Sequence, residues 1–319
     1  MRPVLEIENL RVDFPDGTAA VRGVSLRVDR GETHCLVGES GCGKSVTALA
    51  AMNLLPRGAT RSADIMRFHD EDLTRLSERQ MSRLRGARMA MIFQEPMTSL
   101  NPAYTIGSQM TEVFQRHRHA TRAQGMDRAA ELLERVSITA PGMRLAQYPH
   151  QLSGGLRQRT MIAMALMCDP ELLIADEPTT ALDVTVQAQI LRLIQTLQRE
   201  LGLAVLLITH DLGIVARMAQ RVSVMYAGQV VESGSAADLF GAPTHPYTCG
   251  LLACIPIPGK TPRDQPLGSI PGTVPKTGAG FSGCAFRDRC SYATADCAGT
   301  IPRRTVAADH RTLCTMVPA

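Results

Sequence analysis

The sequence has no tryptophan, and aromatic residues make up only 4% of its 319 positions. Proteins that hold single-stranded nucleic acid stack its bases on aromatic side chains, so this scarcity argues against such a surface. Charge is nearly balanced, with 34 basic and 30 acidic residues and a net charge of +4. A nucleic-acid site would need a stripe of basic residues, and nearly equal numbers of basic and acidic residues do not indicate one. We therefore expect no nucleic-acid partner.

Long hydrophobic runs are missing as well. The longest apolar stretches, such as Ala204–Ile208 and Met161–Cys168, fall well short of the roughly 18 residues typical of a membrane-spanning helix. The N-terminal segment MRPVLEIENL has one early arginine, then acidic residues, and no apolar core typical of a secretion signal. These features predict a chain that stays in the cytosol.

The pattern along the chain predicts an α/β fold. Residues 4–8 and 21–29 alternate apolar with polar side chains, as half-buried strands do. Buried strands are predicted at 34–38, 172–175 and 204–209, and helices at 44–55, 127–136, 156–166 and 187–201. Strands that alternate with helices indicate a parallel sheet with helices packed against it.

Two regions depart from this alternation. Residues 103–150 lack strand patterning, which indicates a mostly helical insert. From residue 241 the chain is rich in proline, glycine and cysteine and poor in periodicity. We therefore expect a main domain at 1–240 and a small, loop-rich C-terminal extension at 241–319.

Residues 38–45 (GESGCGKS), here called the phosphate loop, fit the pattern G-x-x-x-x-G-K-[ST]. Glycines let backbone N–H groups turn inward around phosphate oxygens, and the following helix adds its dipole. Lys44 is expected to reach the β- and γ-phosphates, and the Ser45 hydroxyl to bind Mg²⁺. A predicted strand before the loop and a predicted helix after it favour this interpretation over a chance glycine loop.

A second motif supplies two carboxylates. Four apolar residues at 172–175 are followed by Asp176 and Glu177. Asp176 suits the coordination shell of Mg²⁺, and Glu177 is placed to polarise a water that attacks the γ-phosphorus. The alternative is that the two acids only cap the next element before Pro178.

Between these motifs, residues 152–155 (LSGG) resemble the signature of ABC-type ATPases. Further segments resemble other motifs of that family, in the family's order: the Q-loop at Phe93–Pro96, the D-loop at Ala181–Asp183 and the switch histidine at Ile208–Asp211. The resemblance covers residues 4 to about 240. It implies a P-loop NTPase cassette with a RecA-like parallel sheet core, an antiparallel β subdomain and a helical subdomain at about 103–155.

The resemblance implies a site for ATP and Mg²⁺. The residues implied in ATP binding are Phe14, Gly38, Glu39, Ser40, Gly41, Cys42, Gly43, Lys44, Ser45, Val46 and Asp176. Phe14 would lie against the adenine, and Ser45, Gln94 and Asp176 would hold Mg²⁺. Glu177, His210 and Gln94 would carry the catalysis. Without the resemblance, Gln94 would be interpreted as an ordinary loop residue and His210 as the neighbour of a helix N-cap.

The signature is implied to act on a second cassette. Its residues are Leu152, Ser153, Gly154, Gly155 and Leu156, with Asp183 in the D-loop. The predicted helix that follows Ser153 offers backbone N–H groups and a dipole that favour an anion. In the family that anion is the γ-phosphate of ATP bound to the partner cassette. Leu156 stands where glutamine is frequent, but an apolar residue there is seen in the peptide-importer branch.

Two strings of residues resemble one branch of the family, the oligopeptide, dipeptide and nickel importers. They are Met91–Pro102 (MIFQEPMTSLNP) and Thr244–Thr248 (THPYT), the latter followed by Ile255–Pro256 and by Ile270–Pro275 (IPGTVP). The resemblance implies an ATP-hydrolysing translocase subunit that powers import of oligopeptides or dipeptides. It implies as partners a second, paralogous ABC ATPase, two transmembrane permease subunits and an extracytoplasmic peptide-binding protein. The chain would then lie at the cytoplasmic face of the cell membrane, with residues 94–115 as the permease docking face.

Other functions stay open at this point. A nickel or glutathione importer would have nearly the same ATPase, because substrate choice lies in the other subunits. An ABC ATPase that acts on nucleic acid or the ribosome is less favoured, since the chain has one cassette and no coiled-coil insert. A regulatory cassette without hydrolysis is disfavoured because both Glu177 and His210 are present.

The nine cysteines argue against a disulfide framework in a cytosolic chain and towards metal or redox chemistry. Cys284, Cys290, Cys297 and Cys314 are separated by five, six and sixteen residues. These gaps are wider than the paired spacing of structural zinc sites and do not fit bacterial ferredoxins. Spacing therefore leaves zinc, an iron–sulfur cluster and free thiols open. The resemblance to branch members with a four-cysteine tail implies a [4Fe–4S] cluster.

Overall fold

The structure is a computed structural model that describes residues 3–94, 99–180, 182–255, 268–275 and 282–316. The chain forms two compact units. The first unit comprises Met1–Val28, Thr33–Thr74 and Ile208–Ala319, and the second comprises Asp29–Glu32 and Arg75–Leu207. The first unit contains the phosphate loop and the C-terminal extension, and the second contains the signature and the two acidic residues after 172–175.

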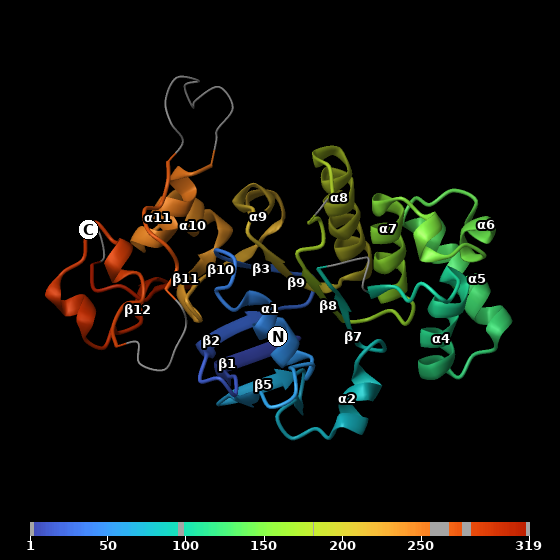
Figure 1. Cartoon of the computed structure of the whole chain (residues 1–319), viewed down its shortest axis with the longest axis horizontal. Helices are drawn as coiled ribbons and strands as arrows, with labels where there is room; N and C mark the ends of the chain where they lie inside the picture. Colours follow the sequence, from blue (N-terminus) through green and yellow to red (C-terminus); the bar gives the residue numbers. More distant parts are fainter. Residues whose placement is uncertain (1–2, 95–98, 181, 256–267, 276–281, 317–319) are drawn as a thin grey trace. The chain divides into compact units, whose positions relative to one another are not determined.

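The first unit has an antiparallel sheet in the order β2-β1-β5-β6, with β4 also paired to β1 (Figure 1). Its strands are β1 (Leu5–Asp13), β2 (Ala19–Val28), β4 (Thr60–Ser62), β5 (Ile65–Phe68) and β6 (Glu71–Asp72). On β1, Leu5 and Ile7 are buried while Glu8 is exposed, which is the alternation that a sheet with one covered face requires. This sheet confirms the predicted strands at 4–8 and 21–29.

The first unit also contains strands of a second sheet, which lie in the order β12-β13-β11-β10-β3. These strands are β3 (Thr33–Val37), β10 (Arg221–Tyr226), β11 (Gln229–Ser235), β12 (Arg304–Ala307) and β13 (His310–Thr312). All five residues of β3 are buried, and β3 pairs in parallel with β10, as predicted for a strand that leads into a helix. Strand β13 of the C-terminal extension pairs with β11, so the extension adds strands to this sheet.

The helices of the first unit include the one predicted at 44–55, which is shorter than expected. They are α1 (Lys44–Ala51), α9 (Leu212–Met218), α10 (Ala236–Gly241) and α11 (Pro246–Ala253), with 3₁₀ turns η2 (Arg287–Arg289) and η3 (Ala295–Ala298). The helix predicted at 44–55 ends four residues early because the chain turns at Asn53, whose φ is 53°.

The second unit carries the strand order β9-β8-β7, with β7 and β8 parallel. The strands are β7 (Met89–Ile92), β8 (Leu172–Asp176) and β9 (Ala204–Thr209), the last two residues of β9 falling in the first unit. Both β8 and β9 are buried throughout, as their apolar runs predict.

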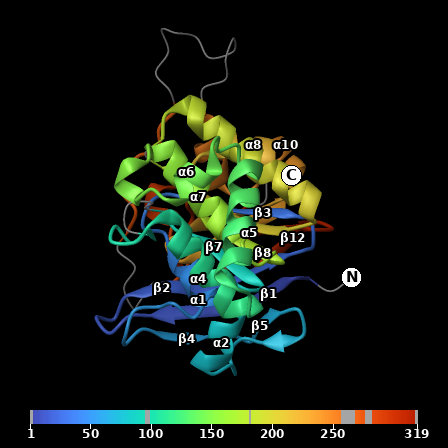
Figure 2. The ribbon, with the colours of Figure 1, turned by 90° about the vertical axis from the view of Figure 1, so that its right-hand side faces the viewer.

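Helices make up the rest of the second unit. They are α2 (Glu78–Leu84), α4 (Ile106–Arg118), α5 (Arg122–Arg135), α6 (Pro141–Leu145), α7 (Gly154–Ala165) and α8 (Val184–Leu201), with the turn η1 (Pro149–Gln151). Helices α4 to α6 and η1 confirm a helical insert in 103–150 (Figure 2). Helix α5 begins with a capping box between Thr121 and Gln124. None of the helices in the described part of the chain has the length and hydropathy to span a bilayer.

A buried carboxylate on strand β11 holds the extension in place. Glu232 on β11 is only 1% exposed. It accepts hydrogen bonds from the Thr244 amide (2.7 Å), the Thr244 hydroxyl (2.8 Å), the His245 amide (3.0 Å) and His310 Nε2 (2.7 Å). Burial alone would raise the pKa of Glu232, but hydrogen bonds from its neighbours hold that pKa below its ordinary value.

We predict that Glu232→Gln lowers the free energy of unfolding by about 3 kcal/mol, because an amide NH₂ would then face groups that are themselves donors. The wild-type contribution should be complete above pH 4.5, the ordinary pKa, and should be lost as pH falls through the lowered folded-state pKa. Urea unfolding of the full chain at several pH values measures both effects. Glu134→Gln, at an exposed site on α5, is the matched control, and equal stability of the two variants would refute the prediction.

Candidate nucleotide site and cysteine pocket

The phosphate loop turns through three glycines between β3 and α1. Gly38, Gly41 and Gly43 have φ values of 155°, 78° and 103°, which residues with side chains rarely adopt. Space is also lacking, since a Cβ on Gly38 would overlap the Met225 carbonyl and one on Gly43 the Ala20 carbonyl. Only glycine therefore allows this backbone path.

Lys44 begins α1 and is only 5% exposed. Its Nζ donates to the carbonyl oxygens of Gly38 (2.8 Å) and Glu39 (3.0 Å). Ser45 and Val46, both half-buried, complete the first turn of α1. A buried ammonium beside the N-terminal amides of a helix is an arrangement that attracts phosphate.

Two other residues expected at the ATP site lie in this unit. Cys42 is fully buried, and that burial raises the pKa of its thiol, which keeps the sulfur protonated. Phe14 lies in the turn between β1 and β2, where its amide donates to the Thr18 carbonyl (2.9 Å). Phe14 is half-exposed rather than buried in the core, so its ring remains accessible to a ligand.

In the second unit, β8 delivers the two carboxylates. Asp176 ends the strand and is buried. Glu177 follows with φ 45°, a strained backbone for a residue with a side chain. Its carboxylate accepts hydrogen bonds from Gln94 Nε2 (3.1 Å) and the Thr180 hydroxyl (2.9 Å). The structure thus brings together Gln94 and Glu177, two predicted catalytic residues from distant motifs.

The signature forms the N-terminus of α7. Ser153 is the N-cap, and its hydroxyl accepts from the Leu156 amide (3.4 Å). Ser153 and Gly154 are exposed, whereas Leu152 is buried and anchors the turn. A Cβ on Gly155 would lie 3.0 Å from Val186 Cγ1, so a small residue is favoured there. The arrangement leaves backbone N–H groups of a 12-residue helix facing outward.

The remaining motif residues lie at other helix starts. Asp183 caps α8, accepting from the Val186 amide (2.9 Å), and the next residue, Val184, is 81% exposed. His210 is exposed directly after β9, and Asp211 caps α9 by accepting from the Gly213 amide (2.7 Å). Glu95, Pro96, Ala181 and Pro256 lie outside the described residues.

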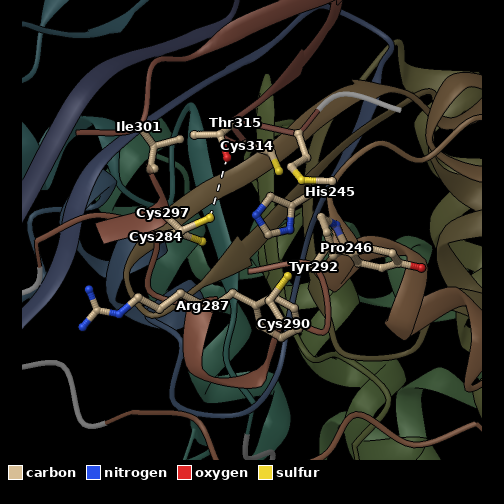
Figure 3. Close-up of a pocket in the computed structure, with 12 residues that line it drawn as sticks. His245, Pro246, Cys284, Arg287, Cys290, Tyr292, Cys297, Ile301, Cys314 and Thr315 are labelled. Atoms are coloured by element: carbon tan, nitrogen blue, oxygen red, sulfur yellow. Dashed lines mark hydrogen bonds between the residues drawn. The ribbon is translucent and has the colours of Figure 1, made fainter. Parts of the chain in front are cut away.

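Four cysteines of the extension line one small pocket in the first unit (Figure 3). Cys290 follows η2, Cys297 lies in η3 and Cys314 follows β13, with Cys284 on the loop before η2. Even so, within the described ranges no three His, Cys, Asp or Glu side chains stand close enough together to hold a metal ion. A formed metal centre, which the [4Fe–4S] expectation requires, is therefore not supported here.

His245 also lines this pocket and is 1% exposed. Its Nδ1 accepts a hydrogen bond from the Tyr247 amide (3.1 Å), which places the ring proton on Nε2. Nε2 is buried and has no hydrogen-bond partner among the described residues. Burial lowers the pKa of His245 to about 4, so the ring is neutral. The pocket therefore contains an unsatisfied N–H donor beside four sulfur atoms.

The thiols of the pocket differ in acidity. Burial raises the pKa of Cys284, Cys290 and Cys314. A hydrogen bond from the Thr294 backbone lowers the pKa of Cys297. Only Cys297 therefore has surroundings that favour the thiolate.

Sequence reasoning missed two residues that contact the phosphate loop. Arg289 and Tyr247, both in the extension, hydrogen-bond Glu39. The THPYT string that contains Tyr247 served only as a mark of resemblance, and Arg289 lies in no motif. Contacts between positions more than 200 residues apart leave no signal in a single sequence.

The chain matches the family described as ABC transporter over residues 21–180, and the oligopeptide/dipeptide transporter C-terminal region over residues 231–297. With the phosphate loop, the paired carboxylates and the signature in place, this chain belongs to the ABC transporter family as an ATP-binding cassette. The second match covers residues 231–297, which include most of the extension.

Relatives match nearly the whole chain. It is 48% identical to the dipeptide transport ATP-binding protein DppD of Bacillus subtilis, covering 98% of this chain and 94% of that one. It is 49% identical to the probable D,D-dipeptide transport ATP-binding protein DdpD of Escherichia coli, and the match covers 98% of this chain and 96% of DdpD. A probable peptide ABC transporter ATP-binding protein of Sinorhizobium fredii, y4tR, is 50% identical, and the match covers 94% of this chain and 90% of y4tR.

Solved structures confirm the cassette fold. CbiO1 of Clostridium perfringens, part of an ABC transporter complex, is 27% identical, with a TM-score of 0.63 over 76% of this chain and 92% of that one. The dimeric bacterial ABC transporter cassette MJ0796 is 25% identical, with a TM-score of 0.64 over 73% of this chain and 98% of MJ0796.

Proposed function

We propose that this chain hydrolyses ATP to power the import of oligopeptides or dipeptides through partner permease subunits. The observation that carries the proposal is the match, over 94% to 98% of the chain, to ATP-binding proteins named for peptide and dipeptide transport. None of these three relatives is named for nickel or glutathione, which leaves those alternatives without a supporting observation. The family and the site chemistry both assign ATP as the energy source.

In the proposed reaction the chain's own groups bind and orient the reactants. Inward N–H groups of the phosphate loop and the Lys44 ammonium bind the β- and γ-phosphates. Glu177 accepts a proton from a water whose oxygen attacks the γ-phosphorus, and the bond to the β-phosphate oxygen breaks to release ADP and phosphate. The hydrogen bond from Gln94 (3.1 Å) holds the Glu177 carboxylate in one orientation. His210 is proposed to contact the γ-phosphate and that water.

Oxygen donors suit the expected Mg²⁺. The Ser45 hydroxyl, the Asp176 carboxylate and the Gln94 amide oxygen are hard ligands of the kind that Mg²⁺ prefers. Asp176 is buried at the end of β8. When bound, Mg²⁺ would neutralise charge that develops on the phosphates.

A second cassette completes the proposed site. Ser153 and Gly154 are exposed at the start of α7, where outward N–H groups can bind the γ-phosphate held by a partner. Leu156 donates its amide to the Ser153 cap, and its apolar side chain offers no hydrogen bond to a nucleotide. The exposed Asp183 and Val184 suit contact with a neighbouring chain. MJ0796, at 25% identity, is described as dimeric, which supports a paired arrangement, here with a paralogous chain.

The remaining partners follow from peptide import. We place the chain at the cytoplasmic face of the cell membrane, held there by two transmembrane permease subunits. An extracytoplasmic peptide-binding protein would deliver the substrate. Within the proposed docking face at 94–115, Tyr104 is an exposed aromatic residue, the kind of side chain that anchors protein interfaces.

We predict that Glu177→Gln lowers ATP turnover of the complete transporter by at least about 100-fold, because the attacking water loses its base. ATP should still bind with an affinity within about twofold of wild type, since the phosphate loop is unchanged. ATPase assays and uptake of a labelled dipeptide, with Ni²⁺ uptake in parallel, measure the outcome. Undiminished turnover would remove Glu177 from its role, and uptake of Ni²⁺ alone would overturn peptide import. Glu134→Gln is the control.

We also propose that the cysteine pocket holds a [4Fe–4S] cluster. Four thiols line one pocket, and thiolates are the ligands of such clusters. The unsatisfied His245 N–H in the same pocket suits a hydrogen bond to a sulfur of the cluster. When bound, the cluster would join η2, η3 and the segment after β13.

The full chain purified without oxygen should contain four irons and four sulfides per chain. Cys297→Ser should lose most of the iron, because it removes a ligand. Cys249→Ser, at an exposed site outside the pocket, should keep it. Metal and sulfide analysis with absorption spectroscopy measures this, and finding zinc alone would refute the cluster.

A further inference from the structure

An ion pair joins the C-terminal extension to the phosphate loop. Arg289, the last residue of η2, donates from Nη1 to both carboxylate oxygens of Glu39, at 3.1 and 3.0 Å. The Arg289 side chain is 7% exposed and that of Glu39 27%, so the pair is largely shielded from solvent. Shielding makes such a charge-assisted contact stronger than a surface ion pair.

The rest of the Arg289 guanidinium is held by the extension itself. Nε donates to the Pro271 carbonyl (2.8 Å) and Nη2 to the Ile270 carbonyl (3.2 Å). The same group lies 5.8 Å from the ring centres of Tyr226 and Phe286. Because the guanidinium is fixed on several sides, it restrains Glu39 rather than following it.

Tyr247 holds the backbone at the same residue. Its hydroxyl accepts a hydrogen bond from the Glu39 amide (3.0 Å). The Tyr247 ring is fully buried, with its centre 4.7 Å from that of Tyr226 and 5.3 Å from that of Phe286. Both the side chain and the amide of Glu39 are therefore held by residues of the extension.

The orientation of Glu39 matters for phosphate binding. Its carbonyl and that of Gly38 accept the hydrogen bonds of Lys44 Nζ, so these two peptide groups set where the ammonium lies. The Glu39 carboxylate is the one acidic side chain within the phosphate loop. If it were released from Arg289, its negative charge could turn towards the phosphates and repel them.

We propose that Arg289 and Tyr247 are positioning residues for the phosphate loop. They hold Glu39 so that its carboxylate stays away from bound phosphate and its carbonyl stays on Lys44. The affinity for ATP and ADP then depends on the extension, although its residues take no part in the chemistry. This inference rests on the proposed ATPase function.

The test measures equilibrium binding of MgATP and MgADP to the full chain by calorimetry, and ATP turnover in the transporter complex. Arg289→Ala should weaken the binding of both nucleotides about tenfold, because the loop meets the β-phosphate that they share. At saturating ATP the turnover number should stay within about twofold of wild type. Arg304→Ala, at an exposed arginine on β12, is the matched control and should bind both nucleotides as wild type does.

Three further variants separate positioning from general destabilisation. Glu39→Gln should weaken binding about threefold and keep the fold, and Tyr247→Phe should do the same. Adding Glu39→Gln to Arg289→Ala should restore part of the lost affinity, because it removes the released negative charge that repels phosphate. Wild-type affinity for nucleotide in Arg289→Ala would overturn the inference. If Arg289→Ala fails to fold, wild-type affinity in Glu39→Gln would do so. A double variant whose loss of affinity equals the product of the two single losses would also overturn it. Absence of nucleotide binding in the wild type would instead refute the proposed function.

Discussion

A backbone that only glycine can follow is the constraint on which the nucleotide site depends. At Gly38 and Gly43 a side chain would collide with the carbonyls of Met225 and Ala20, and the φ values are positive. This tight path places the N-terminus of α1 and the buried ammonium of Lys44 together directly after a fully buried strand. The remaining motifs are proposed to add a base, a metal ligand and a contact for a partner, and each of these roles requires that the phosphates are first held here.

The C-terminal extension is tied to the same loop by polar contacts and by the packing of buried aromatic rings. Buried Glu232 holds the THPYT segment and β13, and that segment in turn presents Tyr247 to Glu39. Arg289 adds the charged contact from a turn that borders the cysteine pocket. A group bound among those cysteines would lie one residue along the chain from the arginine that restrains the phosphate loop. Such proximity gives the extension a physical route to the nucleotide site.

Much of this fold could be predicted from the sequence because local signals were strong. The apolar runs at β3, β8 and β9 and the glycines at 38, 41 and 43 indicated the right elements, and the motif order indicated the family. Other features depended on contacts between distant residues. The hydrogen bond from Gln94 to Glu177 and the contacts of Arg289 are set by tertiary packing. Wide cysteine spacing likewise gave no sign that the four thiols line one pocket.

The affinity of the full chain for MgATP after Gly43→Ala tests the central claim most directly. A methyl group at this position would force the loop to move, so binding should weaken at least tenfold while the chain remains folded. Gly241→Ala is the matched control, because a Cβ there would meet no atom within 4 Å. Wild-type affinity in a folded Gly43→Ala chain would contradict the claim that this glycine-built cradle binds the nucleotide.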